Sequence, residues 1–364
     1  MSISMEFNNN TLMNRGEMKR MKFSTIISVI FKQFNHEKTV NAAYYLLRGK
    51  RSGQAIQDAK YYHLENYFSI LPKLSLRQFN EEIAHLVKIE YIKVDESSFV
   101  MLTNEGLREL ENMPENYFNG WHYRGREQIF FKRLSLIVQT VSQFKNGEPK
   151  FIPLENDTEI QRFVKQFLQD KAFQTPAFAQ MLYFQLQTVL ENAPLTDVQK
   201  NIFVYRLTGY EQVGWTWSQL ASTFNMRELD AKLLWVESLH YILREAEQNP
   251  KLDLLREMAF GIRLVETLTE STQKTQKLFQ EGYLLEQIAQ IRNLKNSTIE
   301  DHYIEMALND PYFPIAQFVT VELMREVQQQ SSQLQTKKLS VLKEQFPKLS
   351  YFQLRLILAV PMKE

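Results

Sequence analysis

The sequence predicts a mainly helical protein of several domains: an N-terminal winged helix followed by helical domains that carry two helix-turn-helix motifs. Glycine and proline, which interrupt helices, number only 11 each among 364 residues, and this favours helical structure. Two stretches of the chain also share one spacing. The first is Ala221, Asn225, Met226 and Ala231, and the second is Ala289, Asn293, Leu294 and Ile299.

This spacing is typical of a helix-turn-helix. A small residue in the first helix lets the second helix cross closely over it, and Asn tolerates the left-handed backbone of the turn. The two apolar positions that follow lock the second helix onto the first. Such motifs most often serve nucleic acids, but they also occur as plain packing units, so the chemistry of the site has to be considered separately.

The length of the chain favours two or three domains. Residues 1–20 are polar, Asn-rich and aperiodic, so we expect a disordered leader, with Met21 as a second candidate start. Residues 21–112 are expected to form the winged helix, residues 113–270 a central helical domain, and residues 271–364 a C-terminal helix-turn-helix domain. A connector interrupted by Pro114, Gly120 and Gly125 follows the winged helix.

The winged helix is predicted from its order of elements. Three helices are expected first, over Phe23–Phe34, Val40–Leu47 and Ser52–Phe68. Ser75 and Gln78 form a capping box that starts a fourth helix. Two β-rich runs, Tyr91–Val94 and Phe99–Leu102, flank four polar residues and predict a hairpin, and Thr103 is placed to cap a closing helix.

Later helices are predicted mainly from capping signals. Thr196 with Gln199, and Thr216 with Gln219, are further capping boxes. A long helix is expected from Arg227 to Gln248, another over residues 251–275, and Ser297-x-x-Glu300 is expected to cap the second recognition helix. The closing segments are an exposed Gln-rich stretch over Gln328–Gln335 and two helices over Leu339–Phe346 and Ser350–Val360.

Composition excludes several classes of chemistry. The chain has no cysteine, which removes disulfides, thiolate catalysis and Cys-based zinc sites and fits a reducing cytoplasm. The six histidines form no metal-binding pattern, and Lys50 after Gly49 lacks the earlier glycine of a Walker A loop. No apolar run is long enough for a membrane span. We therefore expect a cytoplasmic protein that is not an enzyme and has no metal and no cofactor.

Two basic groups are the candidates for phosphate contacts. One is Arg48, Lys50 and Arg51 at the end of a helix, and the other is Arg124, Arg126, Lys132 and Arg133 in and after the connector. Ordinary solvated surface charge is the alternative explanation for each group. Because the net charge is only +1, any attraction for nucleic acid has to come from such local clusters.

The presumed recognition helices are acidic, which conflicts with simple DNA binding. The second one, over Ser297–Ala307, carries Glu300, Asp301 and Glu305 and neither Lys nor Arg. Carboxylates that face phosphates repel them, so in a DNA groove these acids have to point away or read cytosine amino groups. Otherwise the motif is a packing unit or a protein-binding face. For the central motif we favour packing, because its second helix is strongly apolar.

Specific residues indicate a family. Gly282-Tyr283-x-x-Glu286-Gln287-Ile288-Ala289 followed by Ser297-Thr298-Ile299-x-x-His302 resembles the helicase-type helix-turn-helix domain at the end of some RecQ DNA helicases. The segment Tyr45–Ala59 is similar to the YpbB-like proteins of Gram-positive bacteria. Those proteins carry the helicase-type domain without the motor domains of a helicase. Their gene often neighbours the gene of a RecQ-type helicase. The central motif also looks like the helix-turn-helix of sigma-factor region four.

The resemblance implies that Ser297, Thr298 and His302 of the recognition helix take part in DNA binding. It also implies DNA and a RecQ-type helicase as partners. The leading hypothesis is a non-catalytic DNA-binding accessory factor that acts with such a helicase in DNA repair or recombination. The alternatives are an adaptor that binds the helicase and not DNA, and a transcription regulator.

Overall fold

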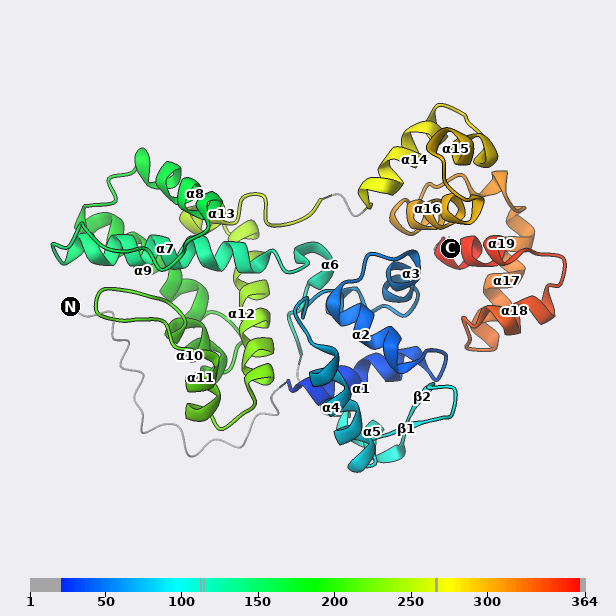
Figure 1. Cartoon of the computed structure of the whole chain (residues 1–364), viewed down its shortest axis with the longest axis horizontal. Helices are drawn as coiled ribbons and strands as arrows, with labels where there is room; N and C mark the ends of the chain where they lie inside the picture. The colour runs from blue at the N-terminus through cyan, green and yellow to red at the C-terminus, as the bar shows by residue number, and fades with distance from the viewer. Residues whose placement is uncertain (1–20, 112, 114, 266–267, 361–364) are drawn as a thin grey trace.

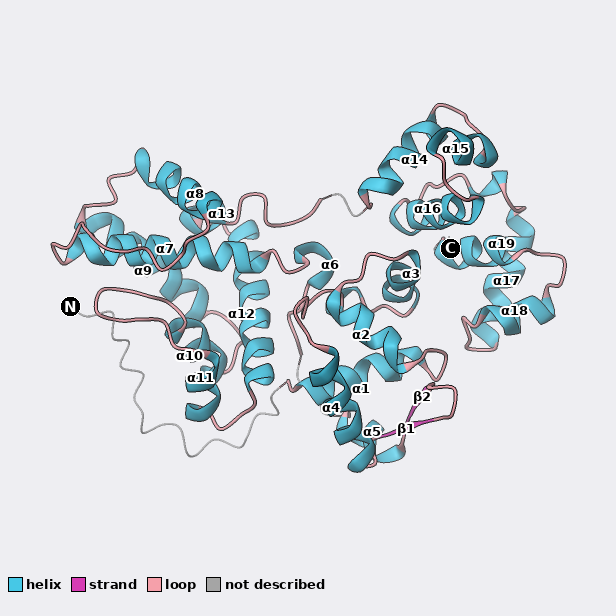
Figure 2. Cartoon of the chain, viewed as in Figure 1, coloured by secondary structure: helices cyan, strands magenta, loops and turns pink. Residues whose placement is uncertain are grey.

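The computed structural model describes residues 21–111, 113, 115–265 and 268–360, and the expected leader over residues 1–20 lies outside them. Helices dominate this part of the chain, as predicted, and its β-structure is one two-stranded antiparallel sheet plus isolated bridges (Figure 2). The helices form three groups, which we call the N-terminal unit (α1–α5), the central unit (α6–α13) and the C-terminal unit (α14–α19).

The N-terminal unit has the order of elements of a winged helix. Its helices are α1 (Phe23–Phe34), α2 (Val40–Arg48), α3 (Gly53–Tyr61), the short 3₁₀ helix η2 (Glu65–Tyr67), α4 (Leu76–Lys88) and α5 (Asn104–Glu109). The predicted hairpin is confirmed: β1 (Ile92–Val94) pairs with β2 (Val100–Leu102), with Ile92 opposite Leu102. The capping box of Ser75 and Gln78 and the cap by Thr103 are also confirmed.

The prediction of one helix over Ser52–Phe68 was wrong. Helix α3 ends at Tyr61, because His63 adopts a left-handed backbone with φ of 53° and the Leu64 amide donates to the Ala59 carbonyl. This turn buries Leu64 and Phe68. A continuous helix would lose that turn and the burial of these two side chains. Tertiary packing therefore determines that α3 ends at Tyr61.

The central unit surrounds the long helix α12 (Glu228–Gln248), which has the predicted length. Around it lie α6 (Gly120–Tyr123), α7 (Glu127–Lys145), α8 (Thr158–Gln169), α9 (Pro176–Glu191), α10 (Asp197–Tyr205), α11 (Trp217–Thr223) and α13 (Asp253–Met258). The prediction of one helix over residues 251–275 was wrong. Helix α13 ends before Gly261, which has a φ of +73°, and the Leu264 amide donates to the His122 carbonyl.

The C-terminal unit consists of α14 (Glu270–Gln280), α15 (Leu285–Arg292), α16 (Asn296–Asn309), η3 (Ile315–Gln317), α17 (Val321–Gln333), α18 (Leu339–Gln345) and α19 (Tyr351–Ala359). Ser297 does not cap α16 as predicted, since the helix starts at Asn296, and Lys295 is the N-cap, two residues earlier, without a side-chain bond. The Gln-rich stretch is not simply exposed. Gln328 is buried, and its amide donates to the carbonyls of Ile357 and Val360.

Both predicted helix-turn-helix turns are present. Asn225 and Asn293 have left-handed backbones, with φ of 47° and 51°. In each turn the next amide, of Met226 or Leu294, donates to the carbonyl of the small residue five positions before it. The apolar locking residues, Ala231 and Ile299, are fully buried. The shared spacing therefore predicted the shared local structure.

The N-terminal unit is first in sequence but lies between the other two in space (Figure 1). Helix α1 packs against α12 on one side, and α3 packs against α16 and α19 on the other. The second helix of each helix-turn-helix therefore lies against the N-terminal unit. This placement governs which of their residues are accessible.

Candidate nucleic-acid interface

The first basic group lies in the tight turn between α2 and α3. Gly49 ends α2 with a φ of +68°, and a Cβ there would come within 2.2 Å of the Ser69 side chain. The Lys50 amide donates to the Tyr45 carbonyl, which completes a helix-ending motif that favours glycine. This turn presents Lys50 and Arg51 at the surface of the molecule.

The three cations of this turn differ in how they are held. Arg48 donates to the Pro72 carbonyl and to the Tyr44 hydroxyl, at 3.3 and 3.1 Å. The ammonium of Lys50 lies 3.9 Å from the centre of the Tyr45 ring. Arg51 is exposed, and among the described residues it makes neither a hydrogen bond nor an ion pair. Arg51 is therefore the cation of this group most available to a phosphate.

One member of the second basic group joins the first. Burial, followed by the charge of Arg51, lowers the pKa of the Arg124 guanidinium to about 10, so the two cations are close enough to interact electrostatically. The Arg124 guanidinium lies 4.6 Å from the centre of the Trp121 ring, and the ammonium of Lys60 lies 4.7 Å from the same ring. We call Arg48, Arg51, Lys60 and Arg124 the junction cluster, because they come from elements of two units.

The other members of the second group are engaged inside the central unit. Arg133 donates to the carbonyls of Met258 and Phe260 at 2.9 and 2.8 Å, and Arg126 donates to the Gly261 carbonyl. Lys132 pairs with Glu155 at 3.1 Å. These carbonyls follow or end α13, so the two arginines hold that helix end in place.

The residues implied by the resemblance have different accessibilities on α16. Ser297 is exposed in the first turn and Thr298 is half-buried. His302 is buried, with its Nδ1 atom 2.8 Å from the Thr275 hydroxyl. Burial and the nearby Arg292 lower the pKa of His302 to about 4. His302 is therefore a neutral side chain inside the unit near neutral pH, and the exposed residues of α16 lie at its start.

Two of the three acidic residues of α16, Asp301 and Glu305, are directed at other helices of the same chain. Asp301 pairs with Arg355 and lies against Gly53 at the start of α3. Glu305 accepts hydrogen bonds from the Thr269 amide and from the hydroxyls of Thr269 and Thr272, in the first turn of α14. Carboxylates at helix starts are stabilised by the unpaired amides and the helix dipole. This explains why a recognition helix is acidic, and no signal in the sequence shows these partners.

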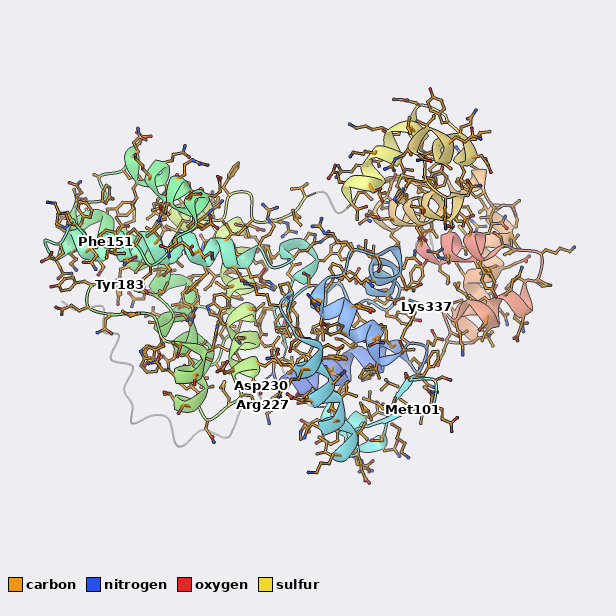
Figure 3. All side chains as sticks on the ribbon, viewed as in Figure 1. Met101, Phe151, Tyr183, Arg227, Asp230 and Lys337 are labelled. Atoms are coloured by element: carbon orange, nitrogen blue, oxygen red, sulfur yellow. The ribbon has the colours of Figure 1, made fainter. Side chains whose placement is uncertain are left out.

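The central motif uses its second helix for packing, as expected. Arg227 pairs with Asp230 at 2.8 Å and with the buried Glu82 of α4, and Asp230 accepts from the Phe23 amide at 2.8 Å (Figure 3). The start of α12 is thereby tied to both α4 and α1. A hydroxyl-rich depression lined by Trp215, Ser218, Gln219, Ser222 and Thr223 remains open on α11.

Two features bear on other kinds of function. No helix within the described ranges is long and apolar enough to cross a membrane. The same residues contain no group of three or more His, Asp or Glu side chains arranged to hold a metal ion. The described residues place exposed cations, Arg48 and Arg51, in the turn before α3, which packs against α16 of the second helix-turn-helix.

The fold and this surface define a helix-turn-helix protein. A family model described as a helix-turn-helix domain matches residues 271–358, which correspond to α14–α19. Protein YpbB of Bacillus subtilis (strain 168) is 30% identical over 339 residues, covering 91% of this chain and 95% of that protein. The chain therefore belongs to the YpbB family. No solved structure matches it.

Proposed function

We propose that the protein is a non-catalytic DNA-binding accessory factor that acts in the cytoplasm with a RecQ-type DNA helicase, in DNA repair or recombination. The observation that carries the DNA-binding part is the junction cluster, with its exposed Arg51, next to a domain that matches the helix-turn-helix family. The helicase part rests on the resemblance of the C-terminal motif to the corresponding domain of RecQ helicases.

Electrostatics supports this assignment of the binding surface. The net charge is only +1, so the whole molecule does not attract DNA. Within α16, Asp301 and Glu305 are directed at internal partners, which removes much of the repulsion that its acidic sequence implies. The cations of the junction cluster are then the groups that contact phosphates, together with Ser297 and Thr298 at the exposed start of α16.

Binding to duplex, forked and single-stranded DNA, measured over a range of salt concentrations, tests the DNA-binding part. Each neutralised phosphate contributes about 0.9 to the slope of log affinity against log salt in B-DNA. We expect an affinity that falls with salt and a slope of a few units. Absence of binding at low salt, or binding that does not respond to salt, would exclude this function.

A second candidate is an adaptor that binds the helicase and not DNA. It is favoured by exposed apolar residues of α15 and its N-cap: Leu284, the N-cap, is 66% exposed, and Ile291, in the last turn, is 55% exposed. Apolar side chains of this size suit a protein partner better than a phosphate backbone.

A pull-down with the purified RecQ-type helicase tests the adaptor. Under this function, Leu284→Glu with Ile291→Glu abolishes helicase capture and leaves DNA binding unchanged. The matched control places the same charges at two other exposed apolar positions of the C-terminal unit, Val321→Glu with Leu334→Glu. Equal capture by both double variants removes this face of α15 from consideration.

A further inference from the structure

We propose that the contact between α3 and α16 is a reversible lock that controls whether DNA can reach α16. The proposal rests on the proposed DNA-binding function and adds its regulation. It arises because the second helix of the matched helix-turn-helix domain, which enters the DNA groove in such motifs, packs here against another unit of the same chain.

In the lock, the Asp301 side chain lies against the backbone of Gly53. A Cβ on Gly53 would lie 3.2 Å from Asp301 Cγ and 3.3 Å from its Cβ. Asp301 also pairs with Arg355 of α19, and Arg355 donates to Gln57 of α3 at 3.2 Å. The Tyr61 hydroxyl donates to the Arg355 carbonyl at 2.6 Å. The carboxylate of α16 is thus held at the positive start of α3 by a polar network.

A second polar contact secures the C-terminal unit elsewhere. Glu37, just after α1, accepts hydrogen bonds from the Lys337 amide at 3.1 and 3.0 Å and from the Thr336 hydroxyl (Figure 3). Tyr62 donates to the same carboxylate at 2.8 Å. The polar contacts across this boundary are these hydrogen bonds and cation–π contacts such as that of Lys337 with the Tyr62 ring, at 5.6 Å. Polar contacts of this kind are typical of interfaces that open and close.

One buried group in the lock favours opening. Gln57 is 2% exposed, and its side-chain nitrogen has no hydrogen-bond partner among the described residues, although its oxygen accepts from Arg355. A buried donor without a partner costs free energy that solvation recovers when the interface opens. The docked state is therefore stabilised by exchangeable polar contacts and opposed by this donor.

Opening would uncover more of α16. In the docked state Asn296 and Ser297 of its first turn are exposed, and Asp301 is partly exposed. Undocking separates Arg355 from Gln57 and Tyr61 of α3 and uncovers the side of α16 that lies against Gly53, while the Arg355–Asp301 ion pair within the C-terminal unit is kept. Arg51 precedes Gly53 by two residues, so the lock lies directly beside the junction cluster.

A disulfide tests the lock directly, because the chain has no cysteine of its own. Gly53→Cys with Asp301→Cys places two Cβ atoms about 3.3 Å apart, a few tenths of an ångström below the usual disulfide range of roughly 3.5–4.5 Å. Fluorescence anisotropy with a labelled duplex of about 20 base pairs, roughly two helical turns, measures affinity in the oxidised and reduced states of one preparation. The two single-cysteine variants control for the oxidant and for loss of Asp301.

We expect the oxidised double variant to bind duplex about tenfold more weakly than the same protein after reduction, a factor typical of coupled sites. Equal binding in both states overturns the lock and leaves the DNA-binding function intact. No binding in either state, with none by the unaltered chain, contradicts the DNA-binding function itself. The two failures are therefore distinguishable.

A loosening variant gives a second test that does not depend on forming the disulfide. Arg355→Ala removes the contacts to Asp301 and Gln57, and we expect it to tighten duplex binding several-fold despite the loss of a positive charge. The matched control, Arg325→Ala, removes an exposed arginine from α17 in the same unit. Tightening by Arg355→Ala alone supports the lock, whereas weakening equal to that of Arg325→Ala refutes it.

Discussion

The Nε2 atom of His240 lies 3.5 Å from a carboxylate oxygen of Glu127, and neither side chain is exposed to solvent. The Nδ1 atom of the same ring accepts from the Asn119 amide at 2.9 Å, so the ring hydrogen of the neutral imidazole is on Nε2 and points at Glu127. The two carboxylate oxygens of Glu127 have no hydrogen-bond partner in the described part of the chain. The pair joins α7 to α12 in the core of the central unit.

Breaking this pair should destabilise the protein. Removing one partner of a buried pair leaves the other without compensation, so we expect His240→Ala to lower the free energy of unfolding by about 3 kcal/mol. Glu127→Gln keeps an oxygen that faces Nε2 and should change the free energy of unfolding by less than about 1 kcal/mol. Urea unfolding of the two variants measures both values, and equal losses would contradict the importance of this pairing.

Glu237 should make stability fall as pH rises. Burial raises the pKa of Glu237 to about 7 from its ordinary 4.5, although the Tyr117 amide and Gln199 donate to it and act in the opposite direction. The folded state therefore binds more protons than the unfolded state between these values, and the contribution of this group is present below pH 4.5 and lost as pH approaches 7. The buried His302 has the opposite effect on the free energy of unfolding. Its pKa is lowered from 6.5 to about 4, so the contribution of this group to stability increases as pH rises between these values.

The comparison with Glu237→Gln isolates this effect. Relative to the unaltered chain, the variant should gain stability between pH 4.5 and 7, by roughly 3 kcal/mol. Denaturant unfolding at several pH values measures the difference. A difference that does not change with pH would show that Glu237 does not titrate in this range.

The turn between α2 and α3 should supply part of the DNA affinity. Replacing Arg48, Lys50 and Arg51 together by Ala should weaken binding and flatten the salt slope by up to about one unit per lost contact. The control is the triple Ala variant of Lys73, Arg77 and Lys93, which are exposed in the same unit. Unchanged affinity and slope in the first variant would eliminate this turn as a phosphate site.

Gly49→Ala should destabilise the N-terminal unit. The new methyl group would meet the Ser69 side chain at 2.2 Å and would require a left-handed backbone with φ of +68°. We expect a loss of about 2 kcal/mol or more, seen as a lower midpoint of thermal unfolding. Gly147→Ala has the same kind of backbone, φ +79°, with open space around it. It should cost less, and an equal cost would contradict the role of Ser69.

Arg133 should contribute to stability and not to DNA binding. Its guanidinium donates to two carbonyls at and just after the end of α13 and lies 3.7 Å from the centre of the Phe163 ring. Arg133→Met keeps the length of the side chain but leaves these carbonyls without a donor, so we expect a loss of about 1–3 kcal/mol and an unchanged salt slope. A flatter slope of log DNA affinity against log salt in this variant would show that Arg133 contacts DNA.

The sequence by itself determined the local structures whose signals lie within a few residues. The capping boxes at Ser75, Thr196 and Thr216 start helices as predicted, and Asn225 and Asn293 make both left-handed turns. The predicted hairpin likewise forms, with antiparallel strands. Each of these depends on backbone hydrogen bonds and φ preferences of neighbouring residues, so no distant partner is needed.

Tertiary structure decided which of the candidate residues are accessible and which come together. The charge of Arg51 acts on Arg124, the Asp301 side chain lies against Gly53, and His302 is buried against Thr275. None of these pairs is close in sequence. Arg126 and Arg133 look like free surface cations in the sequence, yet they bind carbonyls after α13. The reason is physical: charge and residue type are local properties, whereas burial and pairing depend on how separate helices pack, and sequence spacing does not encode that packing.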